Sequence, residues 1–209
     1  SEILEITEKH TDSPVSLELP SSSLSFSLRN TGDRFGVDSD SALVRFFAEG
    51  QQVQVDYGIS VGGEEEWIPG GLWYLSGWKV DGERATFSAE DRIAQLAKTT
   101  YEKGTYDWEL HYMPEYAQSV LADAGLAEDE YYLDPSLSGF YASAPMPIVS
   151  HAEALQLIAN RSLARLYCAR DGRLSIERLT VRPQFTLLPP SANRRYTDSS
   201  DIDSVPADA

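Results

Sequence analysis

The strongest constraint on the fold is a regular alternation of apolar residues and serines in the segment SSLSFSLRN. Leu24, Phe26 and Leu28 fall on one side and the serines on the other, which is the period of a strand with one buried face. The segments QQVQVDYGI and WIPGGLWYLSGWKV continue the β pattern, separated by glycine turns in VGGE and VDGE. Turns at intervals of about 8–12 residues predict a small antiparallel β-barrel or sandwich over residues 1–98.

Two short helices are predicted inside this β segment. SALVRFFAEG, residues 41–50, is apolar all round and ends at a glycine, a common residue after a helix C-terminus. SAEDRIAQLAK, residues 88–98, places Ser88 as the N-cap with the acid Asp91 three residues later. The first segment is therefore predicted to be a barrel-like domain that includes two helices.

The pattern changes to helices between residues 99 and 180. PEYAQSVLADAG places apolar residues on one helical face, and SHAEALQLIANRSL begins with a capping box between Ser150 and Glu153. A hairpin follows, with Asp171 and Gly172 as candidates for a type I′ turn. This order predicts an α+β domain of two helices and a β-hairpin inserted after the barrel.

Residues 181–209 are rich in proline, serine and aspartate, which predicts a connector with an edge strand near Tyr196. The run RRYTDSSDIDSV would begin a second barrel.

The charge balance narrows the classes of partner. The chain has 17 basic and 33 acidic residues, and each of its three predicted segments is net negative. Such a surface repels phosphate backbones and anionic membranes, so specific nucleic-acid binding is not expected. No apolar run approaches the roughly 20 residues of a membrane span, the first ten residues lack the features of a signal peptide, and the single Cys168 allows no internal disulfide.

An acidic loop raises the question of a calcium site. The acids in and after the segment SLRNTGDRFGVDSDSALVRFF are Asp33, Asp38, Asp40 and Glu49. Counted from Asp38, an EF-hand has its terminal glutamate in place, but its fifth and sixth positions are Ala42 and Leu43 instead of an oxygen ligand and glycine. We therefore interpret the loop as turn and helix-cap chemistry. In that reading Arg34 pairs locally with an acid, and Phe35 fills the core or a subunit contact.

Other catalytic signals are weak. None of the histidines, His10, His111 and His151, has a partner at metal-ligand spacing, and Glu64, Glu65 and Glu66 read as the solvated tip of a hairpin. The sequence contains no P-loop, nucleophile elbow or dinucleotide-binding motif. The sequence predicts no catalytic residue, no metal and no cofactor, and a metal hydrolase that uses the aspartate-rich loop is the least favoured hypothesis.

The aromatic residues support two interpretations. Trp67, Trp73, Tyr74 and Trp78 fall within twelve residues, and exposed aromatic rings bind sugars by stacking. A carbohydrate-binding β module of a secreted or cell-surface protein is therefore the alternative function. The alternation around Trp73 favours core packing or a subunit interface. The candidate interface or carbohydrate-stacking residues are Trp67, Trp73, Trp78 and Phe35.

Several segments together resemble the tail hub proteins of siphophages and related prophages. They are SPVSLELPSSSLSFSLRNTGDRF, FFAEGQQVQVDYGI and EWIPGGLWYLSGWKVDGERATFSAEDRIAQL, followed by YAQSVLADAGL, YYLDPSL and SHAEALQLIANRSLARLYCARDGRLSIERL. The resemblance covers residues 12–180 and depends on the order and spacing of the motifs.

The resemblance implies a baseplate-hub-like fold of small barrels with inserted α/β domains. It implies a non-enzymatic structural protein of the virion tail tip, a homotrimer whose ring caps the tail tube and forms part of the channel for DNA during host entry. The implied partners are other copies of the chain and tail proteins such as the distal tail and tape-measure proteins, without a membrane anchor. The chain departs from the family where a second barrel would follow, which puts trimerisation of this segment alone in doubt.

Overall fold

The computed structural model describes residues 2–11, 18–36, 47–104 and 110–179. Contacts between residues group 1–179 into one compact unit. The predicted edge strand near Tyr196 lies outside the described residues, as does the predicted helix 41–50 up to residue 46; the remaining residues of that helix form no helix. No helix in the described ranges is long and apolar enough to cross a membrane.

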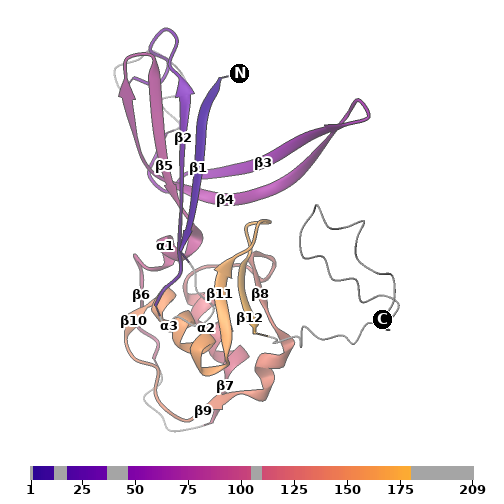
Figure 1. Ribbon diagram of the computed structural model, residues 1–209. Helices are drawn as coiled ribbons and strands as arrows, with labels where there is room; N and C mark the ends of the chain where they lie inside the picture. The colour runs from indigo at the N-terminus through magenta and orange to yellow at the C-terminus, as the bar shows by residue number, and fades with distance from the viewer. Residues whose placement is uncertain (1, 12–17, 37–46, 105–109, 180–209) are drawn as a thin grey trace, which may run out of the picture. The chain divides into compact units, whose positions relative to one another are not determined.

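Five strands form one antiparallel sheet in the order β1-β2-β5-β4-β3 (Figure 1). Their bounds are β1 (Ile3–Thr11), β2 (Ser21–Arg29), β3 (Gln52–Val61), β4 (Glu64–Asp81) and β5 (Arg84–Glu90). The predicted antiparallel β fold is confirmed, but the described strands curl into a half-barrel with β1 and β3 as its two edges. Among the described residues the two edge strands do not pair with each other, so the sheet stays open. Strand β4 pairs with β3 over its first half and with β5 over its second half.

Strand β2 largely follows the predicted alternation. Leu24 is buried and packs with Phe26 beneath the sheet, whereas Ser21, Ser23 and Ser25 are exposed. Ser27 is an exception: its side chain is buried, and its hydroxyl lies 3.1 Å from the Thr86 hydroxyl on β5. The Thr86 hydroxyl gives the buried Ser27 hydroxyl a hydrogen-bond partner, so burial of this polar group does not destabilise the sheet.

The hairpin turns differ in type. Gly62 and Gly63, between β3 and β4, both have positive φ, as a type I′ turn requires. The predicted type I′ turn at Asp171 and Gly172 is wrong, because only the glycine has positive φ. The Gly172 amide donates to the Ala169 carbonyl at 2.9 Å, so a tight turn is followed by a left-handed glycine in a three-residue loop.

Helix α1 (Arg92–Leu96) begins later than predicted. Its N-cap is Asp91, whose side chain accepts a hydrogen bond from the Ala94 amide at 2.9 Å. Ser88 is not a cap, because it lies inside β5 and pairs with Ser25 on β2 and Gly77 on β4. Because β5 pairs with both β2 and β4, the strand continues past Ser88, where the helix was predicted to start.

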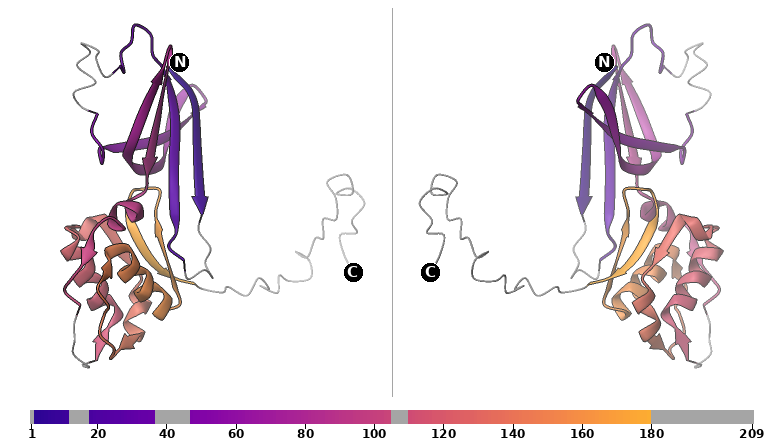
Figure 2. Two further views of the ribbon diagram at one scale, coloured as in Figure 1. Left: turned by 90° about the vertical axis from the view of Figure 1, so that its left-hand side faces the viewer. Right: turned by 90° about the vertical axis from the view of Figure 1, so that its right-hand side faces the viewer.

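The second part of the chain contains α2 (Met113–Asp123), α3 (His151–Arg161) and the hairpin β11 (Ala164–Cys168)–β12 (Leu174–Arg178) (Figure 2). The Ser150–Glu153 capping box of α3 is confirmed. Strand β8 (Tyr131–Leu133) pairs with β12 in parallel. The shorter elements are β6 (Thr100–Tyr101), β7 (His111–Tyr112), β9 (Tyr141–Ala142), β10 (Val149–Ser150) and the 3-10 helices η2 (Glu128–Glu130) and η3 (Pro135–Gly139).

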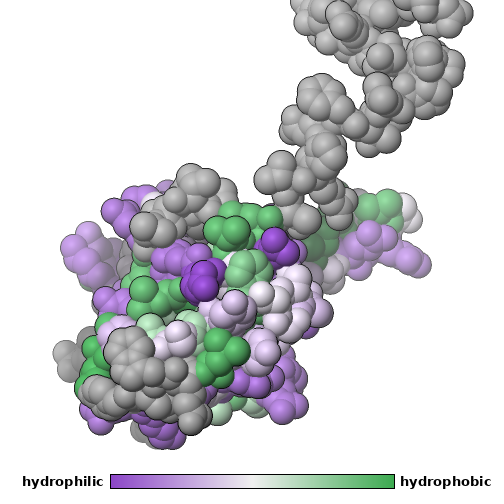
Figure 3. All heavy atoms as spheres, turned by 90° about the horizontal axis from the view of Figure 1, so that it is seen from below, coloured by the Kyte–Doolittle hydropathy of each residue, from purple (hydrophilic) through white to green (hydrophobic). Residues whose placement is uncertain are grey.

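One apolar core holds this α+β part together, and it includes Leu121 of α2, Leu155 of α3 and Ile176 of β12. Ile93 and Leu96 of α1 belong to the same core, although they precede the predicted domain boundary at residue 98. The division into domains 1–98 and 99–180 stays a prediction. On the surface of this part, hydrophobic residues are interspersed with hydrophilic ones in the view from below (Figure 3).

A buried arginine links α1 to η2. Arg92 is 7% exposed, and its Nη1 lies 2.8 Å from Glu130 Oε1. We expect Glu130→Ala to lower the free energy of unfolding by about 1.5 kcal/mol, because it leaves a largely desolvated guanidinium without its acceptor. Urea unfolding followed by circular dichroism measures the change. Glu128→Ala, an exposed neighbour in η2, is the control and should change stability by less than about 0.5 kcal/mol. Equal losses in the two variants would contradict a stabilising role for the pair.

Candidate functional site

A two-stranded arm extends from the half-barrel. We define the arm as residues 56–69, where the end of β3 pairs with the start of β4 around the Gly62–Gly63 turn (Figure 1). Strand β5 pairs with β4 only from Tyr74 onward, so both edges of the arm are open among the described residues. A two-stranded ribbon without further cover is at best marginally stable in water.

One face of the arm is apolar. Tyr57, Ile59 and Val61 alternate along β3 and so share a face, and Ile68 lies directly opposite Tyr57 on β4. These four side chains are between 44% and 57% exposed. We call them the arm stripe. Glu66 and Glu64 lie opposite Ile59 and Val61 and border the stripe with negative charge.

The stripe continues into an apolar groove on the inner face of the half-barrel. The groove encloses about 330 Å³, and its apolar lining comes from β1, β2 and β3. The apolar and aromatic lining residues are Ile3, Ile6, Phe26, Leu28, Val53, Val55 and Tyr57, and Gln54 and Asp56 line the groove as well. Val53 and Val55 precede Tyr57 at alternate positions of β3, so the groove and the arm stripe form one continuous apolar surface.

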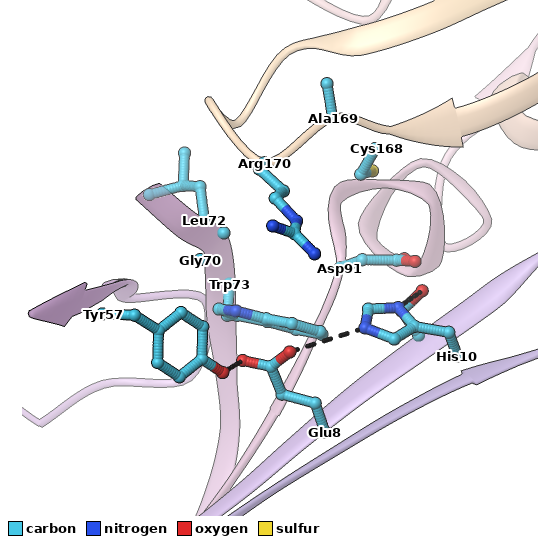
Figure 4. Close-up of a pocket in the computed structure, with 12 residues that line it drawn as sticks. Glu8, His10, Tyr57, Gly70, Leu72, Trp73, Asp91, Cys168, Ala169 and Arg170 are labelled. Carbon is cyan, nitrogen blue, oxygen red and sulfur yellow. Dashed lines mark hydrogen bonds and ion pairs between the residues drawn. The ribbon is translucent and has the colours of Figure 1, made fainter. Parts of the chain in front are cut away.

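A small polar cavity of about 90 Å³ lies at the other end of the half-barrel (Figure 4). The Tyr57 hydroxyl donates a short hydrogen bond to Glu8, and the second Glu8 oxygen lies 3.5 Å from His10 Nε2. His10 Nδ1 in turn lies 3.1 Å from the Ser22 hydroxyl. Glu8 is on edge strand β1 and Tyr57 on edge strand β3, so this bond joins the two edges of the half-barrel.

Asp91 and Cys168, which also line this cavity, both have a raised pKa. Burial raises the pKa of Cys168 to about 12, so the thiol is a poor nucleophile at neutral pH. Burial also raises the pKa of Asp91, whose carboxylate caps α1. Trp73 Nε1 is buried without a hydrogen-bond partner in the described part of the chain. We interpret the cavity as a structural joint, because Glu8 and His10 bond to neighbouring strands and Asp91 caps α1.

The four predicted interface or stacking residues lie in different environments. Phe35 and Trp78 contact one aromatic cluster: Phe35 is edge-on to Phe87 with ring centroids 5.5 Å apart, and Trp78 lies 5.7 Å from Phe47. Trp73 is 3% exposed and forms a wall of the polar cavity. Trp67 is 62% exposed, on the arm face opposite the stripe. A Cβ on its cross-strand neighbour Gly58 would lie 2.8 Å from the Trp67 ring, so this glycine makes room for the tryptophan.

The described part of the acidic loop is scaffold. Asn30 is buried, donates to the Gly82 carbonyl at 3.0 Å and accepts from the Phe35 amide at 3.0 Å. Phe35 fills the core, as expected, but within the described residues Arg34 does not pair with an acid of its own turn. Its partner is Glu2, at 2.8 Å, because the start of β1 lies beside this turn.

Two acids of the hypothetical metal site, Asp38 and Asp40, lie outside the described residues. Within the ranges that the structure describes, no group of three or more histidine, cysteine or acidic side chains is arranged to hold a metal ion. The absence of a metal stays a prediction for the chain.

Sequence reasoning missed both the Glu8–Tyr57 bond and the arm stripe. The alternation of Val53, Val55 and Tyr57 indicated a shared face, but it gave no sign that Ile59 and Val61 extend that face beyond the sheet. Glu8 and Tyr57 are 49 residues apart, and no local pattern connects them.

The buried Asp91 gives a pH prediction. Because its pKa is raised in the folded state, its contribution to stability is fully present below its unfolded pKa of about 3.9 and is lost as the pH rises through the folded value. Asp91→Asn retains a capping oxygen but cannot ionise. We therefore expect the variant to gain stability relative to the parent protein between pH 4 and pH 7. Urea unfolding at both values tests this, and a difference that is constant or shrinks with pH would contradict it.

No protein-family model and no curated protein matches this sequence. Among solved structures, the tail protein from Neisseria meningitidis MC58 matches with a TM-score of 0.50 and 13% identity, over 82% of this chain and 44% of that chain. The 43 kDa tail protein of prophage MuSo2 from Shewanella oneidensis matches with a TM-score of 0.44 and 16% identity, over 85% of this chain and 53% of that chain. The chain thus shares a fold with the first structure and spans less than half of its length.

Proposed function

We propose that this chain is a structural component of a phage or prophage tail, positioned at the tail tip as part of a hub. The observation that carries the proposal is the fold shared with the Neisseria meningitidis tail protein over 82% of this chain. The segments over residues 12–180 that resemble the tail hub family in their order and spacing support the finer assignment to a hub.

In this proposal the chain acts by assembly and not by catalysis. It forms a ring, a homotrimer, that caps the tail tube and contacts neighbouring tail proteins such as the distal tail and tape-measure proteins. The formal net charge of −16 suits the wall of a channel, because an acidic surface does not retain a passing DNA phosphate backbone. The exposed arm stripe supports an assembly role, since contiguous exposed apolar residues mark interaction surfaces.

Immunogold electron microscopy tests the proposal directly. Antibodies raised against the purified chain are applied to particles released from the strain that carries its gene. Gold at the tail tip is the expected result. Gold along the tail tube would reject the hub position but keep a tail role. Particles with intact tails and no gold, although western blots detect the chain in lysates, would overturn the proposal.

The carbohydrate-binding alternative now depends mainly on one residue. Trp67 presents an exposed ring, whereas Trp73 is buried and Trp78 is half-buried. Binding on a glycan array that disappears in Trp67→Ala would favour this alternative.

A further inference from the structure

Three residues of β4 interrupt the strand pairing at the base of the arm. Pro69, Gly70 and Gly71 follow one another there, and proline has no amide hydrogen to donate to a neighbouring strand. Val55 pairs with Gly71 and Asp56 pairs with Pro69, so Gly70 is an extra residue on β4 and forms a β-bulge. A bulge bends the strand and disrupts its hydrogen bonds locally. The pairing between β3 and β4 is therefore weakened at this point.

The two sides of the bulge differ in their support. On the half-barrel side, Trp73 is 3% exposed, and β4 pairs with β5 from Tyr74 onward. Leu72 lies against the turn between β11 and β12, since a Cβ on Gly172 would be 2.8 Å from the Leu72 Cβ. On the other side, the strand segments of the arm, residues 56–69, pair only with each other within the described ranges (Figure 1). The arm is thus attached to a supported strand through the bulge.

A side-chain hydrogen bond ties the base of the arm to β1. The Tyr57 hydroxyl donates to Glu8, and both residues line the small polar cavity (Figure 4). This hydrogen bond raises the pKa of Tyr57, so the hydroxyl keeps its proton at neutral pH. The Tyr57 ring lies over the bulge, because a Cβ on Gly70 would be 2.6 Å from it. The tyrosine therefore spans the weakened pairing and bonds to the edge strand on the far side of the half-barrel.

We propose that the arm pivots about the Gly70 bulge and that the Tyr57–Glu8 bond is a latch that holds it in the position seen in the structure. The inference is independent of the tail assignment, because it depends only on contacts within the chain. The net strength of an ordinary intramolecular hydrogen bond changes the ratio of two populations by roughly 2- to 10-fold. Loss of the latch should raise the fraction of displaced arms by that factor.

Distances between spin labels test the latch and the pivot separately. Double electron–electron resonance measures the distance between nitroxides on two introduced cysteines of the full chain, in a Cys168→Ala background. Dilution with unlabelled chain restricts the measurement to distances within one copy. The arm pair is Ser25→Cys on β2 with Ser60→Cys on the arm, both at exposed positions. The reference pair is Ser25→Cys with Gln52→Cys, which lies opposite Tyr74, where β4 also pairs with β5.

Three variants are compared in both labelled pairs. Tyr57→Phe removes only the hydroxyl of the latch, and Glu8→Ala removes its acceptor. Tyr132→Phe is the matched control, because it removes a hydroxyl from a tyrosine on β8 that is 40% exposed. Circular dichroism checks that each variant is folded.

We expect one narrow distance for the arm pair in the parent protein and in Tyr132→Phe. In Tyr57→Phe the fraction of molecules outside that distance should rise by the factor given above, while the reference pair stays unchanged. Glu8→Ala should give the same rise, and the double variant no more than either alone, since both changes remove one bond.

Several outcomes would overturn the inference. An arm-pair distribution that is the same in the parent protein and Tyr57→Phe, whether narrow or broad, would mean that the bond does not hold the arm. An equal rise in Tyr132→Phe, or additive effects of Tyr57→Phe and Glu8→Ala, would also exclude a latch. A reference pair that broadens together with the arm pair would place the motion outside the Gly70 bulge.

Discussion

Replacing Phe87 with alanine is expected to lower the free energy of unfolding by about 3–5 kcal/mol, the range for large aromatic side chains in cores. Phe87 is 1% exposed at the centre of the half-barrel. Its ring stacks on Phe26 at 4.9 Å between centroids and meets Phe35 edge-on at 5.5 Å. Phe47 lies 5.4 Å away, so the deletion leaves a cavity that several aromatic rings cannot all close.

Urea unfolding followed by far-ultraviolet circular dichroism measures this change. Trp67→Ala is the matched control, because it also removes an aromatic ring from the sheet but from a position that is 62% exposed. The control should change stability by no more than about 0.5 kcal/mol. A loss in Trp67→Ala as large as that in Phe87→Ala would contradict the assignment of the Phe87 loss to its burial in the aromatic cluster.

The sequence predicts well those features that depend on near neighbours. The alternation around Leu24 predicts a strand, the pair Gly62–Gly63 predicts a tight glycine turn, and Ser150 with Glu153 predicts the start of α3. In each case the residues that decide the conformation lie within four positions of one another. Local hydrogen bonds and steric limits are then sufficient to specify the structure.

Local prediction failed where a distant segment decided the outcome. Ser88 has the chemistry of an N-cap, yet pairing with β2 and β4 keeps it in a strand. Tertiary contacts of this kind override weak helix signals. The parallel pairing of β8 with β12 was missed for the same reason, since Tyr131–Leu133 is too short to display a period.

The candidate site was predicted in part. Phe35 was expected to fill the core or a subunit contact, and its burial in the aromatic cluster comes from the Asn30 turn, which is local. Arg34 pairs instead with Glu2, 32 residues away, which only the folded sheet brings close. The arm stripe was read as part of a strand, but alternation alone does not reveal whether the apolar face is covered.

Replacing Leu155 with alanine is expected to cost about 2–5 kcal/mol in the free energy of unfolding. Leu155 is fully buried on α3, in the core shared by α2, α3, β11 and β12. Leu157→Ala on the same helix is the control, because that side chain is 44% exposed and its removal leaves no cavity. Thermal and urea unfolding of both variants measure the difference, and equal effects would contradict the assignment of Leu155 to the core.

The same variants test the predicted boundary at residue 98. Ile93 and Leu96 of α1 pack in the core of Leu155. The Asp91 amide donates to the Ser22 carbonyl on β2, and Arg92 donates to Glu130. Because α1 contacts both parts, we expect Leu155→Ala and Phe87→Ala each to shift one common unfolding transition. In a Trp108→Phe background, tryptophan fluorescence follows β4, which contains Trp67, Trp73 and Trp78, and far-ultraviolet circular dichroism follows α2 and α3. If Leu155→Ala moves the helical signal and leaves the fluorescence transition in place, the two parts unfold independently and the boundary separates true domains.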